Sequence, residues 1–251
     1  MSSIGIVIPC FNEENRLDKD YLLGFLSKNE LIDILLVNDG SRDKTIDLLN
    51  DISSRMPNRI KVLDLKINGG KAEAVRLGIL ELSKTNLYDW LGYFDADFST
   101  ELEEIEHYFK FIPVNRYYDL IVGSRINRLG SIIKRNEFRH YVSRIIGTLT
   151  SRMLEMPVYD TQCGAKLINK SVVNALFTEP FIGSWMFDVE LFARLILLKG
   201  HQTASNNIIE VPLLKWIEKG ESKVSFAFIF KLPLELWRIR QHYFNKKKSN
   251  S

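Results

Sequence analysis

The sequence predicts an α/β fold with a mixed, mainly parallel sheet flanked by helices. Two observations support this prediction. Short apolar runs rich in β-branched residues alternate with longer segments of helical periodicity through the first half of the chain, which is the pattern of βαβ units. The chain has 251 residues, 45% of them hydrophobic, so one domain can bury a large core.

Five strands are predicted in the first half from short apolar runs, at residues 4–9, 31–37, 60–66, 90–94 and 120–123. The helices between them are expected at residues 14–28, 43–54, 70–82 and 100–111. Thr100 and Glu103 have the spacing of a capping box, which predicts the start of the fourth helix.

The second half is less regular. We predict a polar loop over residues 126–136, a glycine-containing segment over 160–168 and a late strand over 208–214. Helices are expected at residues 137–154, 171–177, 187–199 and 224–244, the last one kinked or restarted at Pro233. The chain is accordingly divided into a domain of residues 1–222 and a C-terminal amphipathic helix with a basic tail, residues 223–251.

The charge distribution restricts the partners. The formal net charge is only +3, which argues against a general nucleic-acid binder. Lys and Arg outnumber acidic residues seven to one over residues 121–152 and six to one over residues 231–248. Two basic zones on a nearly neutral chain indicate an anionic partner that binds at particular places.

No segment predicts export or a membrane span, because the apolar runs are too short and the first residues carry no basic side chain. Cys10 and Cys163 lack metal-ligand spacing, which favours a reduced, cytoplasmic chain. The last segment mixes apolar and basic residues. It is expected either to lie peripherally in the inner, cytosolic membrane face or to pack on the domain with a solvated tail.

Polar clusters follow three of the predicted strands, at residues 9–14, 38–41 and 95–97. In open α/β sheets ligands bind beyond the carboxyl ends of the strands, so one ligand could touch all three clusters. Asp39 could accept the N–H of a pyrimidine ring, with Phe11 as a flat apolar face. Asp95 and Asp97 could bring two oxygen ligands to Mg²⁺ or Mn²⁺, which would neutralise a diphosphate leaving group.

Each cluster also has a simpler interpretation. The run Asp39-Gly40-Ser41 is typical of a turn that starts a helix, and an isolated Asp-x-Asp often caps a strand or helix. Residues 68–71 do not form a P-loop, and such a stretch commonly opens a helix. The placement of three clusters at strand ends favours a nucleotide and metal site over these separate explanations.

The strings IPCFNEENRL, LLVNDGSRDKT, YFDAD and VGSR resemble glycosyltransferase family 2, which has the Rossmann-like GT-A fold. YDTQCGAKLI, SWMFDVELFARL and WIEKGESK are similar to a narrower branch, the dolichyl-phosphate β-glucosyltransferases, beside the polyprenyl-phosphate mannose synthases. The resemblance covers about residues 4–240. It implies a metal-dependent, inverting transfer from a nucleotide sugar.

The resemblance also implies roles for particular residues. Those expected to hold the donor base and ribose are Pro9, Phe11, Glu13 and Asp39. Asp95 and Asp97 would hold the metal and diphosphate, and the donor phosphates would also meet Lys71 and Lys223. Where the branch has glycines after the lysine, this sequence has Ala72 and Glu73. The residues expected to hold an acceptor phosphate are Arg125, Arg139 and Ser143, and an arginine fork suits phosphate geometry.

The acceptor decides whether a general base is needed. A phosphate monoester is already a dianionic nucleophile near neutral pH, whereas a sugar hydroxyl needs a base, for which Asp188 is the candidate. Asp188 is alternatively an aspartate favoured by a helix N-terminus, and Cys163 is expected to be structural. The leading hypothesis is glucosyl transfer from UDP-glucose to polyprenyl or dolichyl phosphate. The alternatives are transfer to a sugar hydroxyl in surface-polysaccharide synthesis and a non-catalytic nucleotide-sugar scaffold.

Overall fold

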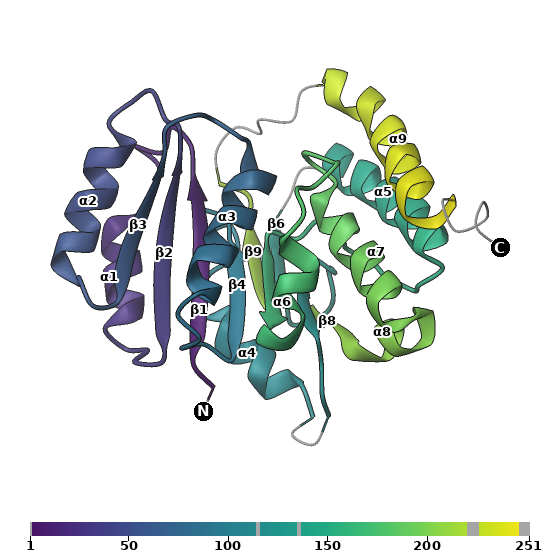
Figure 1. Ribbon diagram of the computed structural model, residues 1–251, viewed down its shortest axis with the longest axis horizontal. Helices are drawn as coiled ribbons and strands as arrows, with labels where there is room; N and C mark the ends of the chain where they lie inside the picture. The colour runs from purple at the N-terminus through teal and green to yellow at the C-terminus, as the bar shows by residue number, and fades with distance from the viewer. Residues whose placement is uncertain (1, 114–115, 135–136, 220–225, 246–251) are drawn as a thin grey trace.

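The computed structural model describes residues 2–113, 116–134, 137–219 and 226–245, with residues 137–140 and 226–231 described for their backbone alone. It confirms the predicted α/β fold (Figure 1). A sheet of seven strands has the order β3-β2-β1-β4-β7-β5-β8. Its strands are β1 (Ile4–Cys10), β2 (Ile32–Asp39), β3 (Ile60–Leu65), β4 (Trp90–Phe94), β5 (Leu120–Ser124), β7 (Ala165–Asn169) and β8 (Ile208–Pro212).

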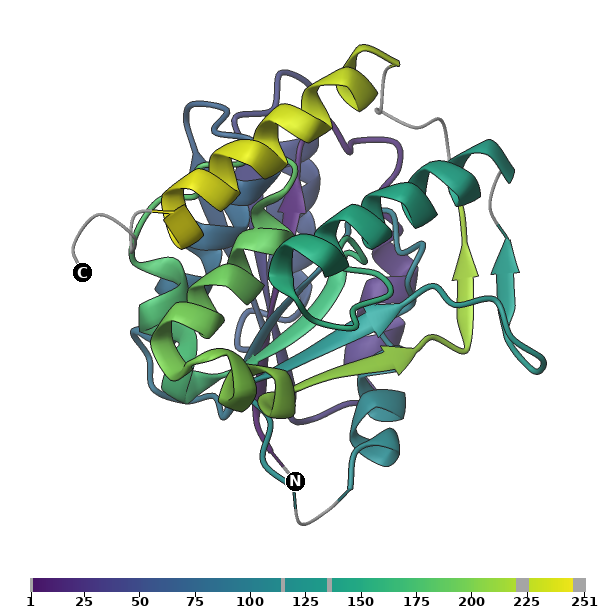
Figure 2. The same cartoon turned by 90° about the vertical axis from the view of Figure 1, so that its right-hand side faces the viewer.

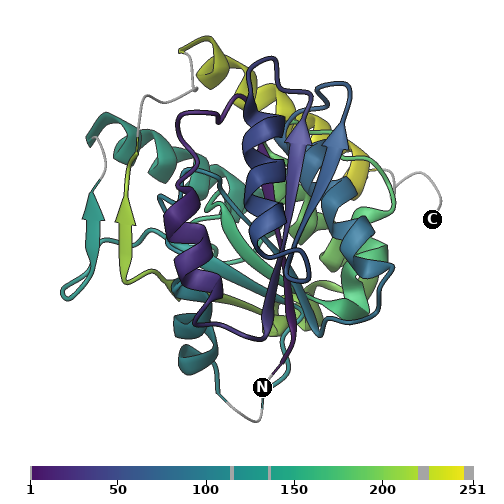
Figure 3. The same ribbon diagram turned by 90° about the vertical axis from the view of Figure 1, so that its left-hand side faces the viewer.

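The sheet is mixed but mainly parallel. The pairs β1–β2, β2–β3, β1–β4 and β5–β8 are parallel, and β7 runs antiparallel between β4 and β5. Figure 3 shows two further strands, β6 (Ile132–Lys134) and β9 (Lys215–Ile217), which form a separate parallel pair beside the main sheet. The carboxyl ends of β2, β1 and β4 are therefore neighbours, which brings the three polar clusters to one edge.

Helices cover both faces of the sheet. One face packs against α1 (Lys19–Leu26), α2 (Thr45–Arg55) and α4 (Glu104–Phe111). The other face packs against α3 (Lys71–Ser83), α6 (Lys170–Phe177), α7 (Phe187–Lys199) and α9 (Phe226–Arg240). The central strand β1 is apolar because alternate residues enter the two cores: Val7 faces one, while Ile6 and Ile8 face the other. The remaining helices are α5 (Glu137–Leu154), α8 (His201–Asn207) and the short η1 (Gln241–Asn245).

Several predicted boundaries were wrong. The first helix starts at Lys19 rather than residue 14, because the Asp18 side chain caps it by accepting the Tyr21 N–H at 3.0 Å. The Thr100–Glu103 capping box does not form: α4 starts at Glu104 without a side-chain cap, and the backbone of Thr100 pairs with Trp216. The predicted loop over 126–136 contains β6, which forms by pairing with β9, about 80 residues away in the chain.

The C-terminal helix α9 continues through Pro233, so of the two predicted alternatives, a kink or a restart, the restart is excluded. Leu232, Leu236 and Ile239 are buried in the core of the domain, whereas Leu234 and Trp237 are exposed. In Figure 1, strands β1–β3 end at the upper side of the molecule, and α9 lies on that same side. Among the described residues, no helix is both long and apolar enough to cross a membrane.

Candidate active site

The loops that follow β1, β2 and β3 are tied together by hydrogen bonds. The Asn12 N–H donates to Ser41 Oγ at 3.1 Å, and Asn12 Oδ1 accepts the Arg42 N–H at 2.9 Å. Asn68 Nδ2 donates to the Asp39 carbonyl at 2.9 Å. Between them Gly40 has a φ of +61°, and any side chain there would collide with the backbone of Asn68. Two of the predicted clusters, residues 9–14 and 38–41, thus form one connected rim with the loop after β3.

The residues expected to hold the nucleotide lie on this rim. Asp39 ends β2 and is only 2% exposed, with Oδ1 accepting the Gly69 N–H at 2.8 Å. Burial raises the pKa of Asp39 above its ordinary value, although the N–H groups of Gly69 and Gly70 oppose that shift. Glu13 is buried, its N–H bonded to Thr45 Oγ1 at 2.8 Å. Two further residues of the predicted set, Pro9 and Phe11, are half-buried at the end of β1.

Asp95 and Asp97 lie in a tight turn directly after β4, which we call the acidic turn. The Asp95 N–H donates to the Gly164 carbonyl at 3.1 Å, and the Asp95 carbonyl accepts the Phe98 N–H at the same distance. Asp97 Oδ1 accepts the Ser99 N–H at 2.9 Å. Burial, and then the neighbouring charge of Asp95, raise the pKa of Asp97 above its ordinary value. A cation placed here would relieve the repulsion between the two carboxylates.

Lys71, the first residue of α3, forms an ion pair with Asp95 Oδ1, as expected if it belongs to the donor site. Withdrawal from water acts to lower the pKa of Lys71, but the carboxylates of Asp95, Asp188 and Asp97 raise it. Ala72 and Glu73 replace the glycines of the branch, but Gly70 has a φ of +83° and open space beside it. A ligand can therefore approach the backbone at Gly70 instead.

The donor set of this turn fits a hard divalent cation. Two carboxylates spaced by one residue offer oxygen ligands of the kind that Mg²⁺ and Mn²⁺ prefer. Within the described ranges, no group of three or more His, Cys, Asp or Glu residues could hold a metal ion. A cation bound by Asp95 and Asp97 would therefore complete its coordination with water or phosphate oxygens.

Gly164, which directly precedes β7, lies against the Asp95 carboxylate, and its lack of a side chain is required. A Cβ at this position would overlap both Asp95 oxygens. We expect Gly164→Ala to weaken Mn²⁺ binding about tenfold or more, as measured by calorimetry, because disturbed support of a ligand commonly costs that much. Gly24→Ala is the control, since no atom lies near its Cβ position. Unchanged Mn²⁺ affinity in the Gly164 variant would show that Asp95 is not a ligand.

Asp188 lies in the first turn of α7 and is only 3% exposed. Its Oδ1 accepts hydrogen bonds from the Tyr93 hydroxyl and from Lys166 Nζ, the latter at 2.6 Å. Lys166 is fully buried and also donates to the Cys163 carbonyl at 2.6 Å. This environment favours the structural interpretation of Asp188, as the counter-charge of Lys166, over a base that meets an acceptor hydroxyl.

Arg125 follows β5 and is paired with an acidic residue of the same chain. Its Nε and Nη2 donate to the two oxygens of Asp160 at 2.7 and 2.8 Å, and its guanidinium lies 5.5 Å from the Trp216 ring centroid. Burial acts to lower the pKa of Arg125, but the Asp160 carboxylate outweighs it and raises that pKa. Two of the guanidinium nitrogens that were expected to bind a phosphate, Nε and Nη2, therefore already donate to the Asp160 carboxylate.

The other predicted acceptor residues lie on α5. The backbone of Arg139 is helical, but its side chain lies outside the described part of the chain. Ser143, one turn later on the same helix, is half-buried. Lys223 lies outside the described residues.

One segment, residues 160–166, contains site residues for which the sequence interpretation had no role. Asp160 holds Arg125, Gly164 contacts Asp95, and Lys166 holds Asp188. The only sequence signal was that they share the string YDTQCGAKLI. Burial raises the pKa of Cys163 to about 12, which opposes a thiolate and agrees with the expected structural role.

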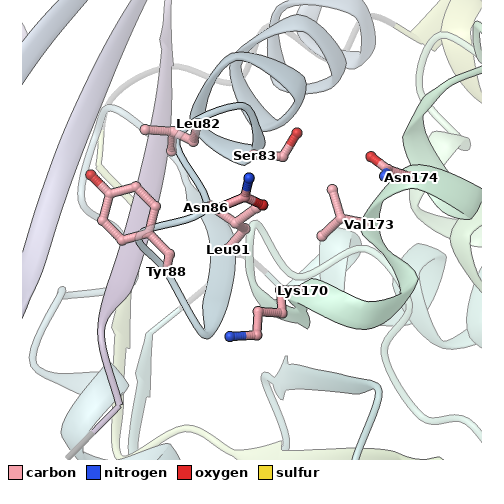
Figure 4. Close-up of a pocket in the computed structure, with 8 residues that line it drawn as sticks. All are labelled: Leu82, Ser83, Asn86, Tyr88, Leu91, Lys170, Val173 and Asn174. Carbon is pink, nitrogen blue, oxygen red and sulfur yellow. The ribbon is translucent and has the colours of Figure 1, made fainter.

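A cavity of about 100 Å³ lies elsewhere, between the end of α3 and the start of α6 (Figure 4). Lys170 lines it and pairs with Asp89, which directly precedes β4. The cavity is therefore at the opposite end of β4 from Asp95 and is separate from the site.

Comparison with known proteins agrees with this geometry. Residues 5–177 match the family model described as glycosyl transferase family 2. A dolichyl-phosphate beta-glucosyltransferase of Trichomonas vaginalis is 30% identical, over 94% of this chain and 70% of its own length. The Drosophila melanogaster protein of that name is 31% identical, over 94% and 77%.

Solved structures agree at the level of the fold. Glucosyl-3-phosphoglycerate synthase from Mycobacterium tuberculosis, in complex with Mn²⁺, UDP-glucose and phosphoglyceric acid, superposes with a TM-score of 0.68 at 14% identity. The superposition covers 95% of this chain and 80% of that one. Because the family model spans more than half of the chain, this protein belongs to glycosyltransferase family 2.

Proposed function

We propose that this glycosyltransferase moves glucose from UDP-glucose onto the phosphate of polyprenyl or dolichyl phosphate, with inversion at the sugar. The observation that carries the proposal is the turn of Asp95 and Asp97 with Lys71 paired to it, at the carboxyl ends of the strands. The names of the relatives in Trichomonas and Drosophila support the choice of sugar and acceptor.

The donor half of the reaction follows from the rim of loops. Asp39 and Glu13 would bind the nucleoside, with Pro9 and Phe11 beside them, and Asp95 and Asp97 would hold Mg²⁺ or Mn²⁺. That cation, when bound, supplies neutralising charge for the diphosphate that leaves. Lys71 forms an ion pair with Asp95, and its ammonium group would pair with a phosphate oxygen of the bound donor.

The acceptor half needs positioning more than proton transfer. A phosphate monoester is largely dianionic above its second pKa of about 6, so it can attack the sugar without a base. The burial of Asp188 against Lys166 supports this choice. Ser143 and Arg139 on α5 would bind the acceptor phosphate. Arg125, which is paired with Asp160, would lie at the edge of the acceptor site. The backbone N–H of Lys219 donates to Ser99 Oγ at 3.2 Å, just after the acidic turn, and Lys219 precedes Lys223 by four residues in the sequence.

Helix α9 is the proposed contact with the cytosolic membrane face. One side of it is buried in the domain, and the other exposes Leu234, Trp237, Arg238 and Arg240. Apolar and basic side chains on one exposed surface favour the interface of a membrane with anionic lipids.

The proposal predicts that the purified protein, Mn²⁺, UDP-[¹⁴C]glucose and vesicles containing polyprenyl phosphate yield radiolabelled lipid. The rate should fall as the pH drops through about 6, because the acceptor dianion is then protonated. Parallel assays with other nucleotide sugars and with free glycans test the donor and the hydroxyl alternative. Labelled glycan without labelled lipid would assign a hydroxyl acceptor, and UDP binding without any turnover would indicate a scaffold.

A further inference from the structure

The loop of residues 182–186, which leads into α7, is held by two carboxylates. Glu190 accepts the N–H groups of Ile182, at 3.1 Å, and of Gly183. Glu235 accepts the N–H groups of Trp185 and Met186 at 3.4 and 3.2 Å, and the Ser184 hydroxyl at 3.3 Å. Four of the five backbone N–H groups in this loop are therefore fixed by negative charges, which form stronger hydrogen bonds than neutral acceptors do.

The two carboxylates differ in their surroundings. Glu190 is fully buried, 3.5 Å from Arg194 and bonded to the Tyr243 hydroxyl at 2.8 Å, so it is part of the core. Glu235 is half-buried and comes from α9, about 50 residues away in the sequence. Glu235 is thus the contact that can be removed without leaving a buried charge unpaired.

Glu235 acts at the N-terminus of α7. The residue that precedes this helix, Met186, makes no side-chain cap, and its own N–H, the first of the terminal N–H groups, is accepted by Glu235. A carboxylate is favoured there because the helix dipole places positive charge at that end. Asp188 is in the first turn of the same helix, where it accepts hydrogen bonds from Lys166 and Tyr93. The helix end that Glu235 contacts is therefore also the end that carries these buried contacts.

The loop lies on the acceptor side of the site. Gln162 Nε2 contacts Met186 Sδ at 3.0 Å, and Gln162 is two residues from Asp160, which holds Arg125. The donor rim is on the other side of β4, at the ends of β1, β2 and β3. Figure 2 shows α9 running along the molecule above α7, and Trp185 is 43% exposed within the loop.

We propose that Glu235 is a positioning residue for the acceptor: from α9 it caps α7 and fixes the 182–186 loop as the acceptor-side wall of the site. The inference rests on the proposed function for the identity of the acceptor. The position of the C-terminal helix therefore sets how well the acceptor binds, and it leaves the donor site unaffected.

The test compares Glu235→Ala and Glu235→Gln with Glu81→Gln, which changes an exposed glutamate near the end of α3, away from both the site and the proposed membrane contact. Hydrogen exchange of the 182–188 amides should accelerate about tenfold in Glu235→Ala and less in Glu235→Gln, which keeps one carbonyl acceptor. The KM for polyprenyl phosphate should rise about tenfold in Glu235→Ala, while the KM for UDP-glucose stays within about twofold. The control should match the wild type in all three measurements.

Two results would overturn the proposal. One is unchanged exchange of the 182–188 amides in Glu235→Ala, which would show that the carboxylate does not hold the loop. The other is an equal rise in both KM values, which would indicate a general loss of structure. If the wild type forms no lipid-linked glucose, the proposed acceptor is wrong, and the exchange measurement still decides whether Glu235 holds the loop.

Discussion

Asp97→Ala should lower kcat for glycosyl transfer by at least about a thousandfold at saturating Mn²⁺ and donor. Asp97 is one of two carboxylates in the turn after β4, and its Oδ1 is held by the Ser99 N–H at 2.9 Å. Without Asp97, a cation would keep only Asp95 as a ligand from the acidic turn. The diphosphate would then leave without its main source of positive charge. Steady-state rates with labelled donor measure the loss.

The same substitution should leave the fold intact. Burial and the charge of Asp95 raise the pKa of Asp97, so the ionised carboxylate is disfavoured in the folded state without a cation. Removing it should change Tm by no more than about 3 °C. Mn²⁺ with UDP should raise the Tm of the wild type but not that of the variant, because only the wild type binds both.

A matched control comes from the other end of β4. Asp89 precedes that strand and pairs with Lys170 at 2.9 Å, far from the acidic turn. Asp89→Ala should retain the wild-type kcat, so it separates the loss of a particular carboxylate from the loss of any aspartate next to β4. Transfer that survived Asp97→Ala at more than a few per cent would show that Asp97 holds no cation.

The donor half of the site could be predicted from the sequence, because its residues directly follow strands that local sequence patterns identify. Strands β1 to β5 were predicted to within about two residues, since a run buried on both faces is apolar throughout. The acidic turn and Lys71 follow strand ends directly, so finding the strands also located them. Parallel neighbours then brought Asp39 and Asp95 to one edge without any long-range information.

The other half depends on contacts between distant residues. The pairing of Arg125 with Asp160 could not be predicted, because the two residues are 35 positions apart. They become neighbours because β7, which follows Asp160, lies antiparallel beside β5. The predicted capping box was wrong for the same reason: the backbone of Thr100 pairs with that of Trp216, which is distant in the sequence. A periodic pattern shows that a strand is buried but not which strands flank it, so residues 160–166 could not be placed.

The largest effect on stability is expected at Lys166, which is fully buried and 2.6 Å from Asp188 Oδ1. In Lys166→Met the Asp188 carboxylate stays in the core without its cation, and within the described part of the chain it keeps the Tyr93 hydroxyl as a donor. Breaking one side of a buried ion pair costs about 3–5 kcal/mol, which corresponds to a Tm lower by roughly 6–20 °C for a chain of this length. Urea denaturation and calorimetry measure the two quantities.

A double-mutant cycle shows whether the cost arises from the unpaired charge or from lost packing. Asp188→Leu alone should be similarly harmful, because it leaves the Lys166 ammonium buried, whereas Lys166→Met with Asp188→Leu leaves no charge unpaired. The double variant should therefore be at least about 2 kcal/mol more stable than the two single losses added together. Lys170→Met, whose lysine is 59% exposed and paired with Asp89, is the control and should cost less than about 1 kcal/mol. Simple additivity of the two core substitutions would mean that Lys166 and Asp188 are not coupled, and Asp188 would again be available as a base for a hydroxyl acceptor.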